Sequence, residues 1–292
     1  MLLEKIKLVE CPRDAMQGWS NFIPTHKKIE YINCLLECGF DTIDFGSFVS
    51  PKAIPQLADT KEVIKGLKLG NRATKLLAIV ANKRGGDEAV VFDEIDCIGF
   101  PFSVSPTFQE RNTNSTIQQS FELVESLQDL CVKKQKTLVI YISMGFGNPY
   151  GDAYSPEIVL EWVEKIAGLE IKIISVADTV GLATPAQVSA LISTLIPAHP
   201  TIEVGVHLHS TALNWQEKLD AALGAGCARF DGALRGIGGC PMAGSDLVGN
   251  MDSELMIPYF IKRALLRDIH LDRIKDASML AAEIFSPSGA AH

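Results

Sequence analysis

The chain has 292 residues, 47% hydrophobic and 21% charged, which allows one or two globular domains with a large core. Its 35 acidic and 27 basic residues give a formal net charge of −8, which argues against broad binding to nucleic acids or anionic membranes. An anionic substrate must therefore be held by a few local cations.

A short apolar strand, a loop and an amphipathic helix recur along the whole chain. The predicted strands are, in order, Ile6–Cys11, Thr42–Phe48, Lys75–Ala81, Ile95–Phe100, Leu138–Ser143, Ile171–Ala177, Val204–His209 and Arg229–Leu234. Several are near-continuous runs of Val, Ile and Leu, which is typical of parallel strands buried on both faces. Successive strands start about 32 residues apart, a spacing that suits βαβ units.

The segments between the strands show the helical period, with apolar residues on one face in 117–131 and 188–195. No linker, repeat block or low-complexity segment divides the sequence. We therefore predict an α/β protein with a single domain, a (β/α)₈ TIM barrel over about residues 5–267, followed by a C-terminal helical extension over 268–292. A doubly wound open sheet is the alternative, but no GxGxxG or GxxxxGK motif follows a predicted strand.

The cellular setting is predicted from what the sequence lacks. No apolar run approaches the roughly 18 residues of a membrane-spanning helix. The first residues enter a strand directly, so we expect no signal or transit peptide. The seven cysteines are odd in number and never spaced as CxxC, which predicts neither a disulfide framework nor a structural zinc site and favours the cytoplasm.

Catalytic groups of a TIM barrel lie at the carboxyl ends of its strands, and His207 and His209 stand at such an end. Side chains two residues apart on a strand face the same way, so both imidazoles can point into the barrel mouth. Two imidazoles on one face can chelate a divalent cation. The alternative is a pair of hydrogen-bonded core histidines.

Asp14, just after the first strand, and Asn250, after the eighth, can complete this metal site because strands one, seven and eight are neighbours in a closed barrel. Two imidazoles, a carboxylate and an amide oxygen leave positions open in an octahedral shell. That set suits Mg²⁺ or Mn²⁺ better than structural zinc, and it invites a bidentate hydroxy or keto carboxylate. Asp14 can instead stabilise a turn, and Asn250 can be a helix N-cap.

Further polar residues are predicted at the same mouth. Arg13 can stabilise a developing enolate or carboxylate oxygen, or serve as a structural ion pair. Asp44 on the second strand and Asp178 after the sixth can position ligands, water or an alcohol proton, or support the structure. Cys240 lies in the glycine-rich segment GIGGCPMAGSDLVG, which can close as a lid, so its thiol is a candidate nucleophile or acid rather than inert packing.

Five segments carry a resemblance to the 3-hydroxy-3-methylglutaryl-CoA (HMG-CoA) lyase family of metal-dependent TIM-barrel enzymes, over about residues 5–270. They are LVECPRDAMQ, SFVSPKAIPQLAD, VADTVGLATP, VHLH and GIGGCP, in this order. SFVSPKxxPQ and GxGGCP are the specific parts, because the synthases of the wider superfamily do not share them. The HxH motif and the early Arg-Asp pair mark only the superfamily.

The resemblance implies the same four metal ligands and the cleavage of HMG-CoA to acetyl-CoA and acetoacetate. It implies that Arg13 stabilises the enolate of the acetyl thioester and that Cys240 is the lid thiol that protonates it. Asp178 matches the aspartate of the family's DT-G motif. The base that removes the hydroxyl proton would be His207, or Asp44 or Asp178 through water.

The acyl-CoA substrate would be the principal partner, and a homodimer is the family expectation, with leucine degradation as one pathway to which the activity could belong. Lys52, Lys83 and Arg84 lie on loops after strands two and three, where they can meet the phosphates of CoA.

The sequence also departs from the family pattern. Asp44 stands where the family usually has Glu, and the segment from Cys240 to Asn250 is one residue longer. Glycines are replaced by Cys11 and Ala15, an Asp and a Tyr by Ser210 and Ala212, and two cysteines by Met144 and Asn148. A related lyase or aldolase acting on another hydroxyacyl-CoA or hydroxy-keto acid therefore remains an alternative, and a non-catalytic metabolite-binding barrel is a second one.

Overall fold

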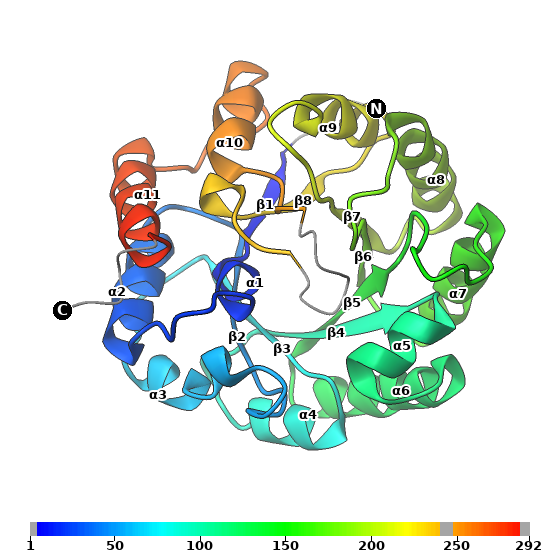
Figure 1. Ribbon diagram of the computed structural model, residues 1–292, viewed down its shortest axis with the longest axis horizontal. Coiled ribbons are helices and arrows are strands. Elements are labelled where there is room, and N and C mark those ends of the chain that lie inside the picture. Colours follow the sequence, from blue (N-terminus) through cyan, green and yellow to red (C-terminus); the bar gives the residue numbers. More distant parts are fainter. Residues whose placement is uncertain (1–4, 240–247, 287–292) are drawn as a thin grey trace.

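The computed structural model describes residues 5–239 and 248–286. Its eight strands close into a ring in chain order, and β8 pairs with β1. Figure 1 shows this ring enclosed by helices. Each strand is parallel to both neighbours, so all carboxyl ends lie at one end of the barrel. The predicted TIM barrel is confirmed.

The strands are β1 (Lys7–Glu10), β2 (Thr42–Ser47), β3 (Lys75–Ile79), β4 (Cys97–Ser103), β5 (Thr137–Ser143), β6 (Ile173–Ala177), β7 (Glu203–His207) and β8 (Arg229–Gly232). Most are shorter than predicted. β3 ends at Ile79 rather than Ala81, and β7 ends at His207 rather than His209, because the ladder of backbone hydrogen bonds ends before the buried pattern does. β4 instead continues to Ser103 beside β5.

The helices cover the outside of the ring. They are α1 (Pro12–Gln17), α2 (Thr25–Leu36), α3 (Thr60–Lys65), α4 (Lys83–Ala89), α5 (Pro106–Thr113), α6 (Ile117–Lys133), α7 (Pro156–Ala167), α8 (Pro185–Ala198), α9 (Trp215–Gly224), α10 (Ser253–Lys262) and α11 (Leu271–Ile284), with short 3-10 turns η1 (Pro55–Leu57) and η2 (Leu234–Gly236). α6 and α8 begin with capping boxes, in which Thr116 pairs with Gln119 and Thr184 with Gln187. None of the helices in the described ranges is long and apolar enough to cross a membrane.

The interior of the barrel is apolar on one side and charged on the other. A separate apolar cluster fills the interior from β3 to β6 with Leu77, Ile79, Cys97, Val139, Tyr141 and Ile173. The buried charged side chains come instead from β2, β7 and β8, among them Asp44, His207, Arg229 and Asp231. Gly205 gives Arg229 its space, because a Cβ there would lie 2.9 Å from the Cδ of Arg229. The charged side is the side on which chemistry can be built.

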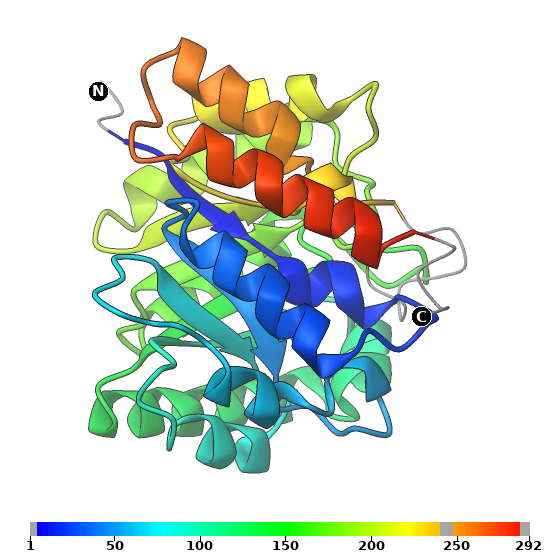
Figure 2. The same cartoon turned by 90° about the vertical axis from the view of Figure 1, so that its left-hand side faces the viewer.

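The predicted C-terminal extension contains α11, which lies beside α2 (Figure 2). The ring of Phe285 meets the ring of Trp19 edge-on at 5.4 Å between centroids. The backbone N–H of His270 donates to the carbonyl of Cys38 at 2.9 Å. These contacts fix α11 against the start of the chain, near the loop that follows α1.

Candidate active site

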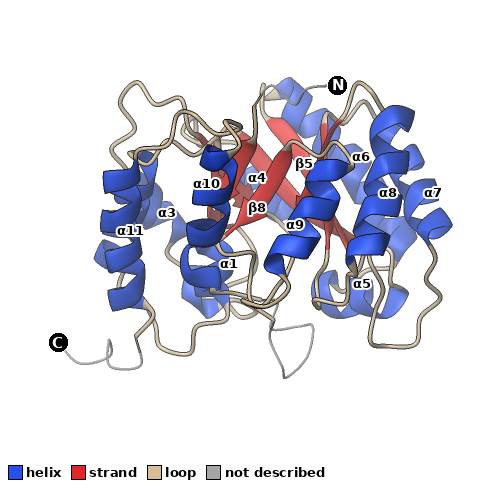
Figure 3. Ribbon diagram, turned by 90° about the horizontal axis from the view of Figure 1, so that it is seen from above, coloured by secondary structure: helices blue, strands red, loops and turns tan. Residues whose placement is uncertain are grey.

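α1 places two of the predicted residues at the carboxyl end of the barrel. Cys11 is the single residue between β1 and α1. Pro12 occupies the first helical position, which its fixed φ favours. Arg13 and Asp14 follow in the first helical turn and are nearly buried, at 9% and 5% exposure. Figure 3 shows α1 and α5 at the same end of the barrel.

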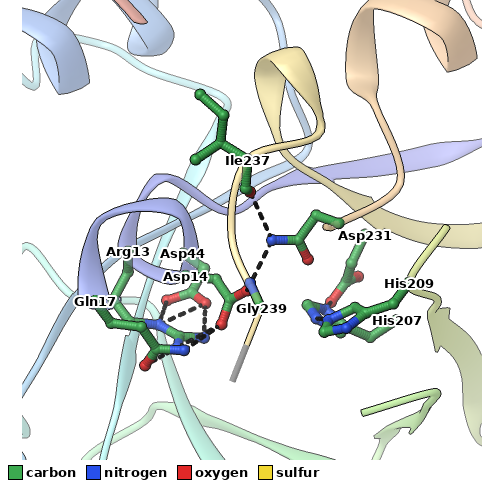
Figure 4. Close-up of polar contacts among 10 residues, drawn as sticks. Arg13, Asp14, Gln17, Asp44, His207, His209, Asp231, Ile237 and Gly239 are labelled. Atoms are coloured by element: carbon green, nitrogen blue, oxygen red, sulfur yellow. Dashed lines mark hydrogen bonds and ion pairs between the residues drawn. The ribbon is translucent and has the colours of Figure 1, made fainter. Parts of the chain in front are cut away.

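The two histidines of the HxH motif lie side by side at the end of β7. Their Nε2 atoms are 3.3 Å apart, and both rings are largely buried. A carboxylate oxygen of Asp14 and one nitrogen from each ring all lie within 4.8 Å of one another. The structure therefore brings these three predicted ligands together, as Figure 4 shows.

Asn250 reaches the same place through a β-bridge with His209. Its Nδ2 donates to Asp14 Oδ2 at 2.7 Å and to the carbonyl of Ile237 at 2.9 Å. Its Oδ1 is buried without a hydrogen-bond partner in the described part of the chain. The N-cap alternative for Asn250 is wrong, because Asp252 caps α10.

The residues present fit a divalent cation. A buried amide oxygen without a partner is costly unless something else contacts it. His207 Nδ1 lies 3.2 Å from Asp231 Oδ2, and since a carboxylate only accepts, the proton of a neutral ring stays on Nδ1. The lone pair of Nε2 then faces His209 and Asp14. Two imidazoles, a carboxylate and an amide oxygen form a mixed nitrogen and oxygen donor set that suits a divalent metal.

The charges of Asp14 and His209 favour metal binding. Burial alone would raise the pKa of Asp14, but Arg13 and the two imidazoles outweigh it and lower that pKa to about 2. Burial lowers the pKa of His209 to about 3, and the neighbouring His207 adds to the effect. Asp14 is therefore ionised and His209 neutral at physiological pH, which are the forms that bind a metal.

Hydrogen bonds to two carboxylates and one amide hold the side chain of Arg13 in one orientation. Its Nε and Nη2 donate to Asp44, at 3.0 Å and 2.5 Å to Oδ2. Its Nη1 donates to Asp14 Oδ1 and to Gln17 Oε1, both at 3.0 Å. Burial by itself would lower the pKa of Arg13, but the carboxylates of Asp44 and Asp14 raise it, so the guanidinium stays charged.

A cavity open to solvent lies at this end of the barrel. Arg13, Asp14 and both histidines line it, and Gln17, Asn112, Tyr141, Ser143 and Thr179 add polar groups. Its other walls are apolar, formed by Val49, Ala53, Ile54, Ile79, Ala81, Pro101 and Phe108. A few polar groups converging in a largely apolar pocket are typical of a small-molecule site.

Comparison with known proteins identifies the family of this chain. The family model described as HMGL-like matches residues 5–280. The hydroxymethylglutaryl-CoA lyase of Bacillus subtilis is 31% identical over 268 residues, which cover 91% of this chain and 88% of that protein. An HMG-CoA lyase of Acinetobacter baumannii, solved with coenzyme A and 3-methylmalate, has a TM-score of 0.89 at 30% identity, covering 97% of this chain and 92% of that one. The chain belongs to the HMGL-like family.

The hydroxymethylglutaryl-CoA lyase of Pseudomonas aeruginosa superposes with a TM-score of 0.90 at 28% identity, covering 100% of this chain and 96% of that one. The curated relatives are named as HMG-CoA lyases, which are carbon–carbon lyases, and this HMGL-like chain is an enzyme of that class. The alternative of a non-catalytic barrel is therefore set aside.

Three site residues of this HMGL-like enzyme, Asp231, Tyr141 and Gln17, were missed from the sequence. Asp231 on β8 accepts from His207, and the ring of Tyr141 meets that of His207 edge-on at 5.9 Å. Gln17 donates from Nε2 to Asp14 Oδ1 at 2.7 Å. Asp231 had a signal as a polar residue, since Arg229 and Asp231 stand two apart in a strand that is buried throughout, although nothing in the sequence indicates its partner.

The structure does not bring Asp178 into the cavity. Its Oδ2 accepts from Lys218 Nζ at 2.7 Å, and its Oδ1 accepts from the backbone N–H of Ala183 at 2.9 Å. The same Lys218 Nζ donates to the carbonyl of His209 at 2.8 Å. This buried ion pair ties β6 to α9 behind His209, so Asp178 supports the site from behind.

Replacing Lys218 by methionine should lower the free energy of unfolding by about 3–5 kcal/mol, because the buried Asp178 carboxylate would lose its counter-ion. Adding Asp178→Asn to that variant should recover part of the loss, since the amide removes the unpaired charge. Urea unfolding followed by circular dichroism measures both. In the control Lys165→Met, which removes an exposed pair with Glu161, we expect a change below about 1 kcal/mol. A Lys218→Met loss no larger than this control would contradict the assignment.

Glu10 is a further buried carboxyl, at the end of β1. Its Oε1 accepts from the backbone N–H of Leu234 at 2.7 Å, and its Oε2 contacts Ser253 Oγ at 2.6 Å. Burial raises the pKa of Glu10 from its ordinary 4.5 to about 8, although these two hydrogen bonds lower it in part. The folded protein therefore keeps a proton at neutral pH that the unfolded chain releases.

The stability contributed by Glu10 should accordingly be full below about pH 4.5 and fall as the pH rises toward about 8, by up to about 1.4 kcal/mol per pH unit. Glu10→Gln removes this titration, so its free energy of unfolding relative to wild type should increase steadily across that range. Urea unfolding at several pH values measures the difference. The exposed Glu122→Gln serves as the control, and a pH-independent difference for Glu10→Gln would refute the assigned protonation.

The predicted CoA-binding cations lie outside the cavity. Lys83 and Arg84 are exposed on α4 and pair with Asp87 and Glu88 one helical turn away. Lys52 is exposed beside the cavity residues Ala53 and Ile54. Cys240 and most of its glycine-rich segment lie outside the described residues.

The departures from the family pattern leave the metal ligands in place. Asp44, although one methylene shorter than Glu, still reaches Arg13. Ser210 leaves the position of the family's Asp without a carboxylate. Its Oγ donates to the sulfur of Met251 at 3.4 Å. Met144 and Asn148 shape the loop after β5, where the backbone N–H of Met144 donates to Thr179 Oγ1 at 2.9 Å.

Proposed function

We propose that this chain cleaves 3-hydroxy-3-methylglutaryl-CoA to acetyl-CoA and acetoacetate with the help of a divalent cation. The observation that carries the proposal is the meeting of a fixed guanidinium, Arg13, with the cluster of Asp14, His207 and His209 on the wall of one cavity. The family membership and the lyase names of the relatives support the same reaction class.

Asp14, His207, His209 and Asn250 would hold Mg²⁺ or Mn²⁺. Such a cation, when bound, acts as a Lewis acid that lowers the pKa of the tertiary hydroxyl of the substrate. The protein contributes a buried shell in which Gln17 and Asn250 orient the carboxylate of Asp14.

Arg13 is suited to stabilise the thioester enolate that forms when the carbon–carbon bond breaks. A guanidinium has five N–H donors, and four of them serve Asp44, Asp14 and Gln17. One N–H of Nη2 therefore remains for the enolate oxygen in the cavity. Because Asp44 and Gln17 fix the group beforehand, little reorganisation is needed as the charge develops.

His207 is the best placed of the three proposed bases. It lines the cavity, whereas Asp44 and Asp178 do not and are paired with Arg13 and Lys218. Nε2 can take up the proton only while it does not bind the cation, which Asp14, His209 and Asn250 would then hold, and Asp231 at Nδ1 would stabilise the imidazolium. As the hydroxyl loses its proton the ketone forms, the bond between the hydroxyl-bearing carbon and the CH2 carbon next to the thioester carbonyl breaks, and its electron pair moves into the enolate.

The enolate carbon then needs a proton, for which we propose Cys240. A thiol with a pKa near 8.5 is mostly protonated at neutral pH and can act as the acid. Cys240→Ser should therefore lower turnover at least about 10²-fold while leaving Mn²⁺ affinity unchanged. Steady-state kinetics with Mn²⁺ titration separates the two quantities. A wild-type rate in this variant would remove Cys240 from the mechanism.

The cavity is suited to an acyl thioester. The apolar wall near Ile54, Ala81 and Phe108 can contact the methyl group and the pantetheine chain. The Acinetobacter baumannii relative was solved with coenzyme A, and Lys52, Lys83 and Arg84 remain our proposed contacts to the CoA phosphates. We also infer a homodimer in the cytoplasm, where the six described free cysteines would stay reduced.

A second substrate is favoured by one observation. Ser210 stands where the family has an Asp, and its hydroxyl contacts Met251. A lost carboxylate near His209 can change which acyl group fits, so another hydroxyacyl-CoA or a 4-hydroxy-2-keto acid is the alternative.

An assay of a small panel of hydroxyacyl-CoAs and 4-hydroxy-2-keto acids, with Mg²⁺ or Mn²⁺, tests the function. We expect the highest kcat/KM for HMG-CoA, loss of activity with EDTA, and recovery on adding Mn²⁺. A higher kcat/KM for another substrate would replace HMG-CoA in the proposal. Full activity after exhaustive metal removal would overturn the metal-dependent mechanism.

A further inference from the structure

A thiol lies behind the imidazole of His207, on the side opposite the proposed metal site. Cys11 is fully buried, and its backbone N–H donates to the carbonyl of Gly232 at 2.8 Å, which fixes it beside β8. Its sulfur, one ring nitrogen of His207 and a carboxylate oxygen of Asp231 all lie within 4.8 Å of one another.

Asp231 offers this cluster an unused ligand atom. The residue is 2% exposed, and its Oδ2 lies 3.2 Å from His207 Nδ1. Its Oδ1 is buried and has no hydrogen-bond partner among the residues that the structure describes. A buried carboxylate oxygen without a partner indicates that a further group can be accommodated there.

We propose that Cys11, Asp231 and Nδ1 of His207 form a second metal site, for thiophilic cations such as Zn²⁺ and Cd²⁺, whose occupation excludes a metal from the first. The donor types support this choice, since thiolate, imidazole and carboxylate are the ligands of zinc, whereas Mg²⁺ binds oxygen. One thiolate and one carboxylate balance the two charges of a divalent cation, which lowers the cost of burying it. His207 lines the cavity and so offers a route of entry.

The two sites compete because they use opposite nitrogens of one ring. Since the carboxylate of Asp231 only accepts, a neutral His207 carries its proton on Nδ1, and the lone pair of Nε2 faces His209. A cation that binds Nδ1 displaces the proton from this nitrogen. The neutral ring then carries its proton on Nε2. The thiol of Cys11 loses its proton to the buffer. An Nε2 that carries a proton can no longer be a ligand of the first site.

Titration with Cd²⁺ alone, without substrate, tests the site directly. Cadmium bound to a thiolate has a charge-transfer absorption in the ultraviolet, which reports the metal–sulfur bond independently of activity. We expect this absorption in wild type and to the same extent in Cys131→Ala, a control that removes another buried thiol, on α6. In Cys11→Ala it should fall by one thiolate per chain, and Cys11→Ser serves the same purpose should the alanine variant not fold. An unchanged absorption in the Cys11 variants would overturn the proposal.

The competition is measured by electron paramagnetic resonance of free Mn²⁺. Adding Cd²⁺ to the Mn²⁺-loaded wild type should release Mn²⁺, and the same addition should release much less in Cys11→Ser. This second result rests on the proposed function of the first site, whereas the absorption does not. Thiolate absorption without Mn²⁺ release would therefore keep the second site and refute the competition. Equal release in both proteins would show that Cd²⁺ simply replaces Mn²⁺ at the first site.

Discussion

Replacing Arg13 by methionine should lower kcat by about 10³-fold, because removing one donor to a developing oxyanion already costs about 10²–10³-fold and this donor also carries the charge. The structure leaves one N–H of Nη2 for the enolate, with the rest of the guanidinium fixed by Asp44, Asp14 and Gln17. The effect should appear in kcat rather than in KM, since the charge develops only as the bond breaks. Single-turnover cleavage of HMG-CoA at saturating Mn²⁺ measures the chemical step.

Two comparisons make this result specific. Arg72→Met is the matched control, because Arg72 forms a comparable ion pair with Asp96 just before β3, at the amino end of the barrel. It should leave kcat unchanged. Arg13→Met/Asp44→Asn removes the carboxylate that Arg13 neutralises, so it should fold better without regaining activity. Recovery of kcat in the double variant would show that Arg13 acts only through the structure.

His209→Ala should weaken Mn²⁺ binding by more than about 100-fold, since outer partners of metal ligands alone are worth about 10–100-fold. At a Mn²⁺ concentration that saturates wild type, turnover should fall by about 10³-fold, because a Lewis acid supplies several kcal/mol of stabilisation. Titration of free Mn²⁺ gives the affinity, and the cleavage assay gives the rate.

The matched control is His199→Ala. His199 follows α8 at the other end of the barrel, where its ring lies 3.5 Å from Glu164. It should keep wild-type affinity and rate. Wild-type Mn²⁺ affinity in His209→Ala would mean that the imidazole is only a packed core residue.

The barrel was predictable because it depends on a repeated pattern. Eight runs of buried branched residues separated by amphipathic segments restrict the fold strongly. The strand ends were less accurate. Leu208 and His209 continue the buried pattern of β7 but pair with the segment after η2, where Met251 N–H donates to the carbonyl of Leu208. Periodicity reports burial and not the partner of each backbone group.

The meeting of Asp14, His207, His209 and Asn250 was predictable for a similar reason. Parallel strands place their carboxyl ends together, so residues at the ends of β1, β7 and β8 must meet. The roles of Asp178 and Asp231 were not predictable, because each depends on one distant partner. Asp178 pairs with Lys218 on α9, and Asp231 on β8 pairs with His207 on the neighbouring strand β7. No local pattern distinguishes an aspartate that faces the cavity from one that supports it.

A crystal soaked with Mn²⁺ and examined by anomalous scattering tests the central claim most directly. We predict one peak within roughly 2.0–2.3 Å of a carboxylate oxygen of Asp14, Nε2 of both His207 and His209, and Oδ1 of Asn250. A peak that both imidazoles share but that lies beyond bonding distance of Asp14 would contradict the account.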